Sequence, residues 1–146
     1  MIFLRHYLDY MIFGVLGFMS FVMLWFVFER YFYYLRIKIE KFDHADSINI
    51  ALTNHLTVIS TIGANAPYVG LLGTVIGIML TFYDMGQGGN VDVQTIMTGL
   101  SLALKATAAG LFVAIPSIIF YNALLRKVDV VNAKWREYQD RITSKK

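Results

Sequence analysis

The polar side chains best placed to do chemistry in this sequence lie inside or beside long apolar segments. None of those segments, Tyr10 to Phe28, His55 to Tyr83 and Ala106 to Leu125, contains an Asp or a Glu. The polar candidates are hydroxyl, amide and ammonium groups: Thr74, Thr81, Lys105, Thr107, Ser117 and Asn122. A hydroxyl there can hydrogen-bond water or a partner's carboxylate, or it can bond the carbonyl four residues earlier in its own helix. The usual intramembrane proton carrier, a carboxylate, is missing from these segments.

Lys105 stands just before the third apolar segment, where an ammonium group is costly unless it is paired or hydrated. Its long side chain could reach back to the outer lipid headgroups. Alternatively, Lys105 could face a water-filled pore or an acidic partner. The residue type alone leaves both interpretations open.

Enzymatic chemistry is not indicated by the other polar residues. His6, His44 and His55 fall outside the predicted membrane spans and lack the spacing of metal ligands. The sequence has no Walker loop, no glycine-rich dinucleotide signature and no pairing of a nucleophile with a base. We therefore expect no enzyme activity, no metal and no cofactor.

The composition identifies the elements that must position these groups. The chain has 146 residues, of which 57% are hydrophobic and 16% charged, and it has no cysteine. This excludes a disordered chain, a disulfide scaffold and a free-standing basic nucleic-acid domain. Uncharged runs of roughly 18 residues or more are typical of transmembrane helices. We predict an all-α integral membrane protein of one domain (1–146), with spans at about 10–28, 66–83 and 101–123.

The distribution of Lys and Arg predicts the orientation of these spans. Eleven of the 13 basic residues follow the first span or the third, and none lies between Asp84 and Gly99. By the positive-inside rule, residues 29–65 and 124–146 are cytoplasmic, and the N-terminus and the loop 84–99 face outward, to the periplasm. The first span could be a signal peptide, but its long apolar run and its Phe-Val-Phe-Glu-Arg end favour a retained anchor.

Small residues recur at helical spacing in the second and third spans. The two stripes are Gly63, Ala66, Gly70, Gly73, Gly77, Thr81, and Gly99, Ala103, Ala106, Gly110, Ala114, Ser117. Such stripes let helix backbones approach closely in a membrane. We expect these two spans to be interior helices of a homo-oligomer, around a channel or packed without one. The first span is bulky on most sides and is expected to face lipid.

Both cytoplasmic ends show further helical patterns. Phe32, Leu35, Ile39 and Phe42 predict that the first helix continues past the membrane, after an aromatic run at 31–34 that is expected to anchor in lipid. The tail has a heptad-like seam: Leu124, Val128, Val131, Trp135, Tyr138 and Ile142. It predicts a helix that packs against neighbours or lies on the membrane surface. Pro67 and Pro116 are candidates for kinks.

Two segments have a more specific pattern. Residues 66–79 read APYVGLLGTVIGIM, and residues 103–111 read ALKATAAGL, followed by AIP at 114–116 and YN at 121–122. They resemble the AP-x-x-GLLGTV-x-GM and EAL-x-AT-x-xGL-x-x-AIP…YN signatures of the MotA/TolQ/ExbB family. The resemblance covers about residues 60–125. Three spans fit the ExbB and TolQ branches better than the four-span MotA type, and the wording is most similar to ExbB.

The resemblance implies a homopentamer in the inner membrane of a Gram-negative bacterium. The pentamer would surround a single-span, ExbD-like partner that supplies an intramembrane Asp, and proton flow would energise a TonB-like transducer for transport across the outer membrane. Thr74 and Thr107 match the family's pore-lining threonines. The same two signatures contain the expected helix-packing residues Gly70, Gly73, Gly77, Gly110 and Pro116. A TolQ-like role in envelope integrity is the alternative within the family. A small proton-coupled transporter or a membrane scaffold is the alternative from another class.

One departure from the family pattern concerns the third span. Leu102 stands where the family has Glu, and Lys105 follows three residues later. The resemblance therefore implies a pore wall without a carboxylate of its own and with a possible cation one turn away. We assign no proton-binding site to Leu102.

Overall fold

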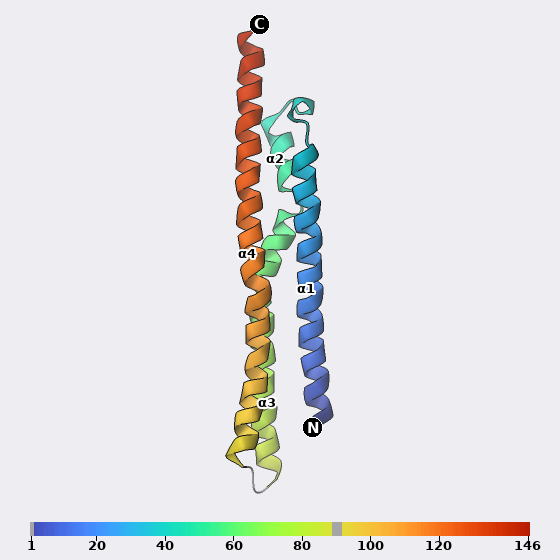
Figure 1. The fold of residues 1–146 in the computed structure, drawn as a ribbon, viewed down its shortest axis with the longest axis vertical. Coiled ribbons are helices and arrows are strands. Elements are labelled where there is room, and N and C mark those ends of the chain that lie inside the picture. Colours follow the sequence, from blue (N-terminus) through green and yellow to red (C-terminus); the bar gives the residue numbers. More distant parts are fainter. Residues whose placement is uncertain (1, 89–91) are drawn as a thin grey trace.

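The computed structural model describes residues 2–88 and 92–146, and that part of the chain is helical (Figure 1). The elements are α1 (Ile2–Arg36), a short 3₁₀ turn η1 (Ile39–Lys41), α2 (Ala45–Thr53), α3 (Leu56–Gln87) and α4 (Val93–Ser144). In the described residues, three helices, α1, α3 and α4, are long and apolar enough to cross a membrane. The prediction of an all-helical membrane protein is confirmed. The tip of the predicted outer loop, residues 89–91, lies outside the described residues.

The three long helices run side by side along one axis (Figure 1). Helices α3 and α4 form an antiparallel hairpin, and α1 packs along both of them. The start of α1 and the turn between α3 and α4 lie at the same end, which we call the outer end. At the opposite end α2 packs against α4.

The two small-residue stripes meet in the hairpin, as their spacing predicts. A Cβ atom added to Gly70 would lie 2.5 Å from the Ala106 carbonyl oxygen and 3.0 Å from the Gly110 Cα. A Cβ atom at Gly110 would lie 2.6 Å from the Ala66 carbonyl oxygen. Farther out, a Cβ at Gly77 would lie 2.8 Å from the Ala103 Cβ. The backbones of α3 and α4 therefore touch where only glycine fits.

Helix α1 covers one side of this hairpin with a single face. Ile12, Leu16 and Met23 are buried on that face, whereas bulky residues such as Phe18 and Trp25 are exposed. The exposed side is apolar, as a surface in contact with lipid must be. Helix α1 thus packs on the hairpin with one face and leaves an apolar face exposed.

The first helix continues past its predicted span, as expected, but it does not reach Phe42. Helix α1 ends at Arg36, and Leu35, on the predicted stripe, is 61% exposed. The chain turns through η1, which leaves the Phe42 carbonyl to accept hydrogen bonds from Trp135 Nε1 at 2.9 Å and Gln139 Nε2 at 3.3 Å. A carbonyl inside a helix would be bonded to its own helix, so these contacts require the break.

The predicted helical tail is confirmed, because α4 continues unbroken to Ser144 and includes Pro116. On its seam, Leu124, Val128 and Trp135 are buried, and the face is covered partly by α2, whose Ile48 and Leu52 are fully buried. The last seam position along the chain, Ile142, is 39% exposed. The seam therefore packs mainly within the same chain.

The Trp135 to Phe42 hydrogen bond offers a test of this end of the fold. Trp135→Phe removes the indole donor while keeping an aromatic ring, and we expect it to lower the free energy of unfolding by about 1 kcal/mol. Trp25→Phe is the matched control, because that ring is 64% exposed and we expect no change. Denaturant titration in detergent measures both. Equal midpoints for the two variants would contradict the contact.

Candidate functional site

The structure brings Thr74 and Thr107, predicted as a pair by the resemblance, into direct contact. Their Oγ1 atoms are 2.5 Å apart, one from α3 and one from α4. The Thr74 Oγ1 also lies 2.9 Å from the Ala103 carbonyl of α4 and 3.4 Å from the Gly70 carbonyl of its own helix. A hydroxyl has one proton and two acceptor lone pairs. The geometry fits a Thr74 that donates to Ala103 and accepts from Thr107.

The close contact of the glycines explains why these hydroxyls meet. Thr74 follows Gly70 by four residues, and Thr107 precedes Gly110 by three. One turn of helix separates each threonine from the place where the backbones touch. A side chain as short as threonine then spans the remaining gap.

The pair opens toward the side of the hairpin that α1 leaves uncovered. Ala109 and Val113 of α4 line a groove between α4 and α1. At about 100° per residue, Thr107 lies about 160° and 120° from these two residues around α4. Thr74 is buried and Thr107 is half-buried. Their neighbour Leu111 is 44% exposed. Among the described residues, Thr107 therefore presents a hydroxyl beside exposed apolar side chains, on the face that α1 does not cover.

Two further candidate hydroxyls, Thr81 and Ser117, donate to their own helices. Thr81 donates to the Gly77 carbonyl at 2.9 Å, and Ser117 donates to the Val113 carbonyl at 2.8 Å. Backbone bonding, one of the two alternatives for a membrane hydroxyl, thus describes these residues. Thr74 differs because its shorter bond crosses to the other helix.

Lys105 does not share the face of the threonine pair. It is exposed and lies two residues before Thr107, which places it about 200° away around α4. Pro116 is half-buried inside α4 and lies nine residues after Thr107 along the chain. The site brought together by the fold therefore consists of Thr74 and Thr107, supported by Gly70 and Gly110.

Comparison with known proteins assigns the chain to a family. The sequence profile of the MotA/TolQ/ExbB proton channel family matches residues 39–137, which include both threonines and both supporting glycines. The chain belongs to this family. It is 56% identical over 133 residues to the biopolymer transport protein ExbB of Helicobacter pylori, across 91% of this chain and 92% of that protein. It is 54% identical over 125 residues to ExbB of Aquifex aeolicus, across 86% and 84%.

A TolQ relative is also similar, over a shorter stretch. The Tol-Pal system protein TolQ of Haemophilus influenzae is 35% identical over 94 residues, which is 64% of this chain and 41% of that protein. The similarity to the ExbB proteins extends over nearly the full length of both chains. The comparison supports an ExbB-like role within the family.

The sequence interpretation missed a polar contact at the outer end. Arg5 donates from Nη2 to Thr81 Oγ1 at 2.8 Å and lies 3.9 Å from the Asp84 carboxylate. These residues border a small cavity of about 120 Å³ between α1, α3 and α4. The available signal was an opposite charge at the outer ends of two neighbouring spans.

The start of α4 has its own polar anchor. Asp92 caps the helix and accepts from the Thr95 backbone N–H at 2.8 Å. Hydrogen bonds from the Thr95 hydroxyl and backbone hold the pKa of Asp92 below its usual value. The cap therefore stabilises α4 above the unfolded-state pKa and is lost as the pH falls through the folded-state value.

Part of the aromatic run at 31–34, at the end of the molecule opposite the outer end, packs within the chain. Arg30 is 4% exposed, pairs with Glu29, and donates to the Ala51 carbonyl at 2.9 Å. Its guanidinium lies over the Tyr33 ring, and the Tyr34 hydroxyl donates to the Leu52 carbonyl at 2.6 Å. This part of the run fastens α1 to α2. The neighbouring residues Tyr31 and Phe32 remain about half exposed, at 49% and 53%.

Proposed function

We propose that this chain is an ExbB-like subunit of a complex driven by the proton motive force in the inner membrane. It acts with an ExbD-like, single-span partner to energise a TonB-like transducer for transport across the outer membrane. The observation that carries the proposal is the Thr74–Thr107 pair, which opens onto the uncovered face of the hairpin. The predicted spans contain no carboxylate, so the proton-carrying group comes from the partner.

The uncovered face also supports a homo-oligomer. Leu71, Val75, Leu104 and Leu111 make it apolar, with exposures between 44% and 60%. The cavity that the three helices border in one chain is only about 120 Å³, too small for a partner's helix. We propose a pentamer in which α3 and α4 line the centre and α1 faces lipid, with the N-terminus outside and the C-terminus in the cytoplasm. The basic residues on the cytoplasmic segments support that orientation.

The hydroxyl pair suits a group that alternates between two charge states. When the partner's carboxylate is ionised, the Thr107 hydroxyl donates its proton to that carboxylate and no longer donates to Thr74. When the carboxyl group is protonated, Thr107 accepts from it and donates back to Thr74. The Ala103 carbonyl holds Thr74 in place in both states. A rotation of one hydroxyl thus serves both states without movement of the helices.

Gene deletion tests the proposed role and separates it from the TolQ-like alternative, which the TolQ relative supports. We expect deletion to abolish outer-membrane uptake that depends on the proton motive force, and the intact gene to restore it. Detergent sensitivity with normal uptake would instead assign the chain to an envelope-integrity system.

Lys105 gives a prediction about the pathway itself. Because it lies on the other side of α4 from Thr107, we expect Lys105→Ala to leave proton-driven uptake within about twofold of wild type. Uptake in the deletion strain, with matched protein amounts, measures this. A strong loss of uptake, together with loss of the partner on purification, would instead indicate that Lys105 faces the pore or contacts the partner.

A further inference from the structure

An apolar groove runs between α1 and α4, on the side of α4 away from Thr107. Its volume is about 480 Å³, and it is lined by Phe13, Leu16, Gly17, Ser20, Ala108, Ala109, Phe112 and Val113. Gly17 has open space beside it, since a Cβ atom there would meet nothing within 4 Å. The groove is thus a recess that the chain does not fill itself.

Two opposite charges lie on the helix faces that line the groove. Each charge is about seven residues nearer the outer end than residues of the groove wall. Asp9 precedes Leu16 by seven residues, and Lys105 precedes Phe112 by seven and Ala109 by four. Residues four or seven apart share a helix face. Asp9 and Lys105 therefore stand at the outer end of the groove, one on each wall.

The packing register places these two charges at nearly the same height. A Cβ atom at Gly73 would lie 3.1 Å from Ile12 Cγ2 and 2.7 Å from the Ala106 Cβ, so Ile12 and Ala106 are level. Asp9 is three residues outward of Ile12, and Lys105 is one residue outward of Ala106. At about 1.5 Å per residue the two differ by about 3 Å along the axis. The long lysine side chain covers that difference.

Neither charge has a partner among residues 2–88 and 92–146. The described ion pairs and hydrogen bonds involve neither side chain, although Asp9 is half-buried. A charged group at the edge of the hydrocarbon requires a counter-charge or water. Here a carboxylate and an ammonium group are presented together.

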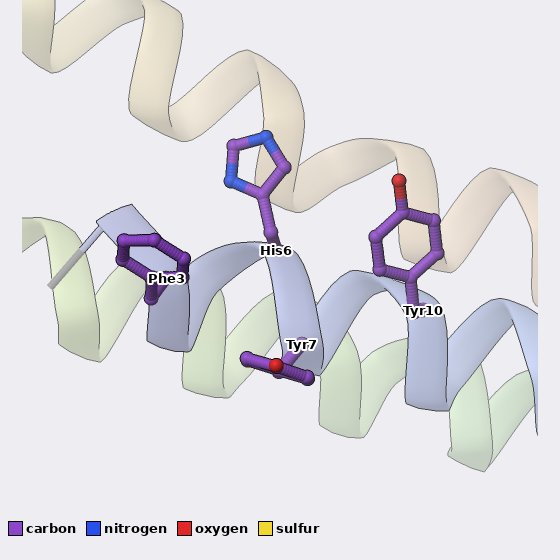
Figure 2. A pocket seen from close by; sticks show the side chains of 4 residues that line it. All are labelled: Phe3, His6, Tyr7 and Tyr10. Carbon is purple, nitrogen blue, oxygen red and sulfur yellow. The ribbon is translucent and has the colours of Figure 1, made fainter.

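The height of these charges matches the boundary of the bilayer. Figure 2 shows Phe3, His6, Tyr7 and Tyr10 along the outer turns of α1, where they border an exposed hollow. Tyr7 and Tyr10, on either side of Asp9, are 66% and 74% exposed. Exposed tyrosines mark the level of lipid headgroups, and the apolar groove begins directly below.

We propose that this groove binds one phospholipid whose headgroup carries a phosphate and a primary ammonium group. An acyl chain fills the groove, Lys105 binds the phosphate, and Asp9 binds the ammonium group. A purely anionic lipid would satisfy Lys105 but place a negative charge beside Asp9, which disfavours it. A neighbouring copy's apolar helix would fill the groove but would bring no phosphate to Lys105 and no ammonium group to Asp9.

Matched glycine variants test occupation of the groove. Gly17→Leu fills the recess, whereas Gly14→Leu places the same side chain at a glycine that also has open space but does not line the groove. The oligomer is purified with its partner from native membranes, exposed to equal amounts of phosphatidylethanolamine and phosphatidylglycerol, and examined by native mass spectrometry. We expect wild type and Gly14→Leu to retain phosphatidylethanolamine, and Gly17→Leu to retain about tenfold less, as loss of about 1.4 kcal/mol implies.

Charge variants test headgroup selection. We expect Lys105→Ala to reduce retention of both lipids and Asp9→Asn to abolish the preference for phosphatidylethanolamine, while Lys127→Ala on the cytoplasmic part of α4 changes neither. Equal retention of the two lipids by wild type, or equal retention by the two glycine variants, would overturn the proposal. So would dissociation of the oligomer by Gly17→Leu with no lipid on wild type, because a second copy would then occupy the groove.

Discussion

Thr107→Ala is expected to abolish most proton-driven uptake while the chain still folds and assembles. The variant removes a hydroxyl from the uncovered face of the hairpin, where Thr107 is half-buried beside Thr74. A hydrogen bond to a charged group contributes about 1.5–3 kcal/mol, so the expected loss is roughly tenfold to hundredfold. Thr107→Ser keeps the hydroxyl and is expected to retain uptake. Uptake in a deletion strain measures all variants at matched protein amounts.

Thr74→Ala is expected to act through its neighbour. It removes the hydroxyl that holds Thr107 and that is itself bonded to the Ala103 carbonyl. Thr74 is therefore a positioning residue, and Thr74→Ser should rescue uptake. Ser117→Ala is the matched control, because that hydroxyl is buried but bonds only its own helix. Wild-type uptake in both alanine variants would refute the role of the pair.

Gly70→Ala is expected to destabilise the protein strongly. In an ordinary helix interior this substitution stabilises by about 1 kcal/mol. Here the new Cβ would lie 2.5 Å from a backbone oxygen of Ala106, and the backbone cannot rotate away as a side chain could. Separation of α3 and α4 would also pull Thr74 from Thr107. We expect a loss of about 3 kcal/mol or more in the free energy of unfolding.

Gly14→Ala provides the control for this clash. Gly14 has open space around it, and we expect its substitution to be neutral or stabilising. Denaturant titration in detergent and the amount of protein in membranes measure both variants. A Gly70→Ala midpoint equal to that of Gly14→Ala would contradict the close approach of the helices.

Much of the fold follows from local patterns in the sequence. Uncharged runs predict the long helices, and the stripes through Gly70 and Gly110 predict which faces meet, because only small residues permit such contact. The seam through Val128 and Trp135 predicts the helical tail. Each of these features repeats over several turns, so a local error does not remove it.

Contacts that depend on one side chain or on chain reversal could not be predicted in this way. The apolar spacing through Phe42 resembled a helix, but the tertiary bond from Trp135 requires a break there. Pattern alone left Thr74 free to bond its own helix, and the choice of Ala103 depends on the distance between two backbones. Which side of α4 packs against α1 depends on the tertiary arrangement, so a local pattern could not predict the surroundings of Lys105.

The most direct test of the proposed role is the mass of the intact complex, purified through this chain from native membranes. We predict five copies of the chain together with a single-span partner that carries an Asp or Glu in its span, and loss of uptake when that carboxylate is removed. A complex that contains this chain alone and still supports proton-driven uptake would contradict the account.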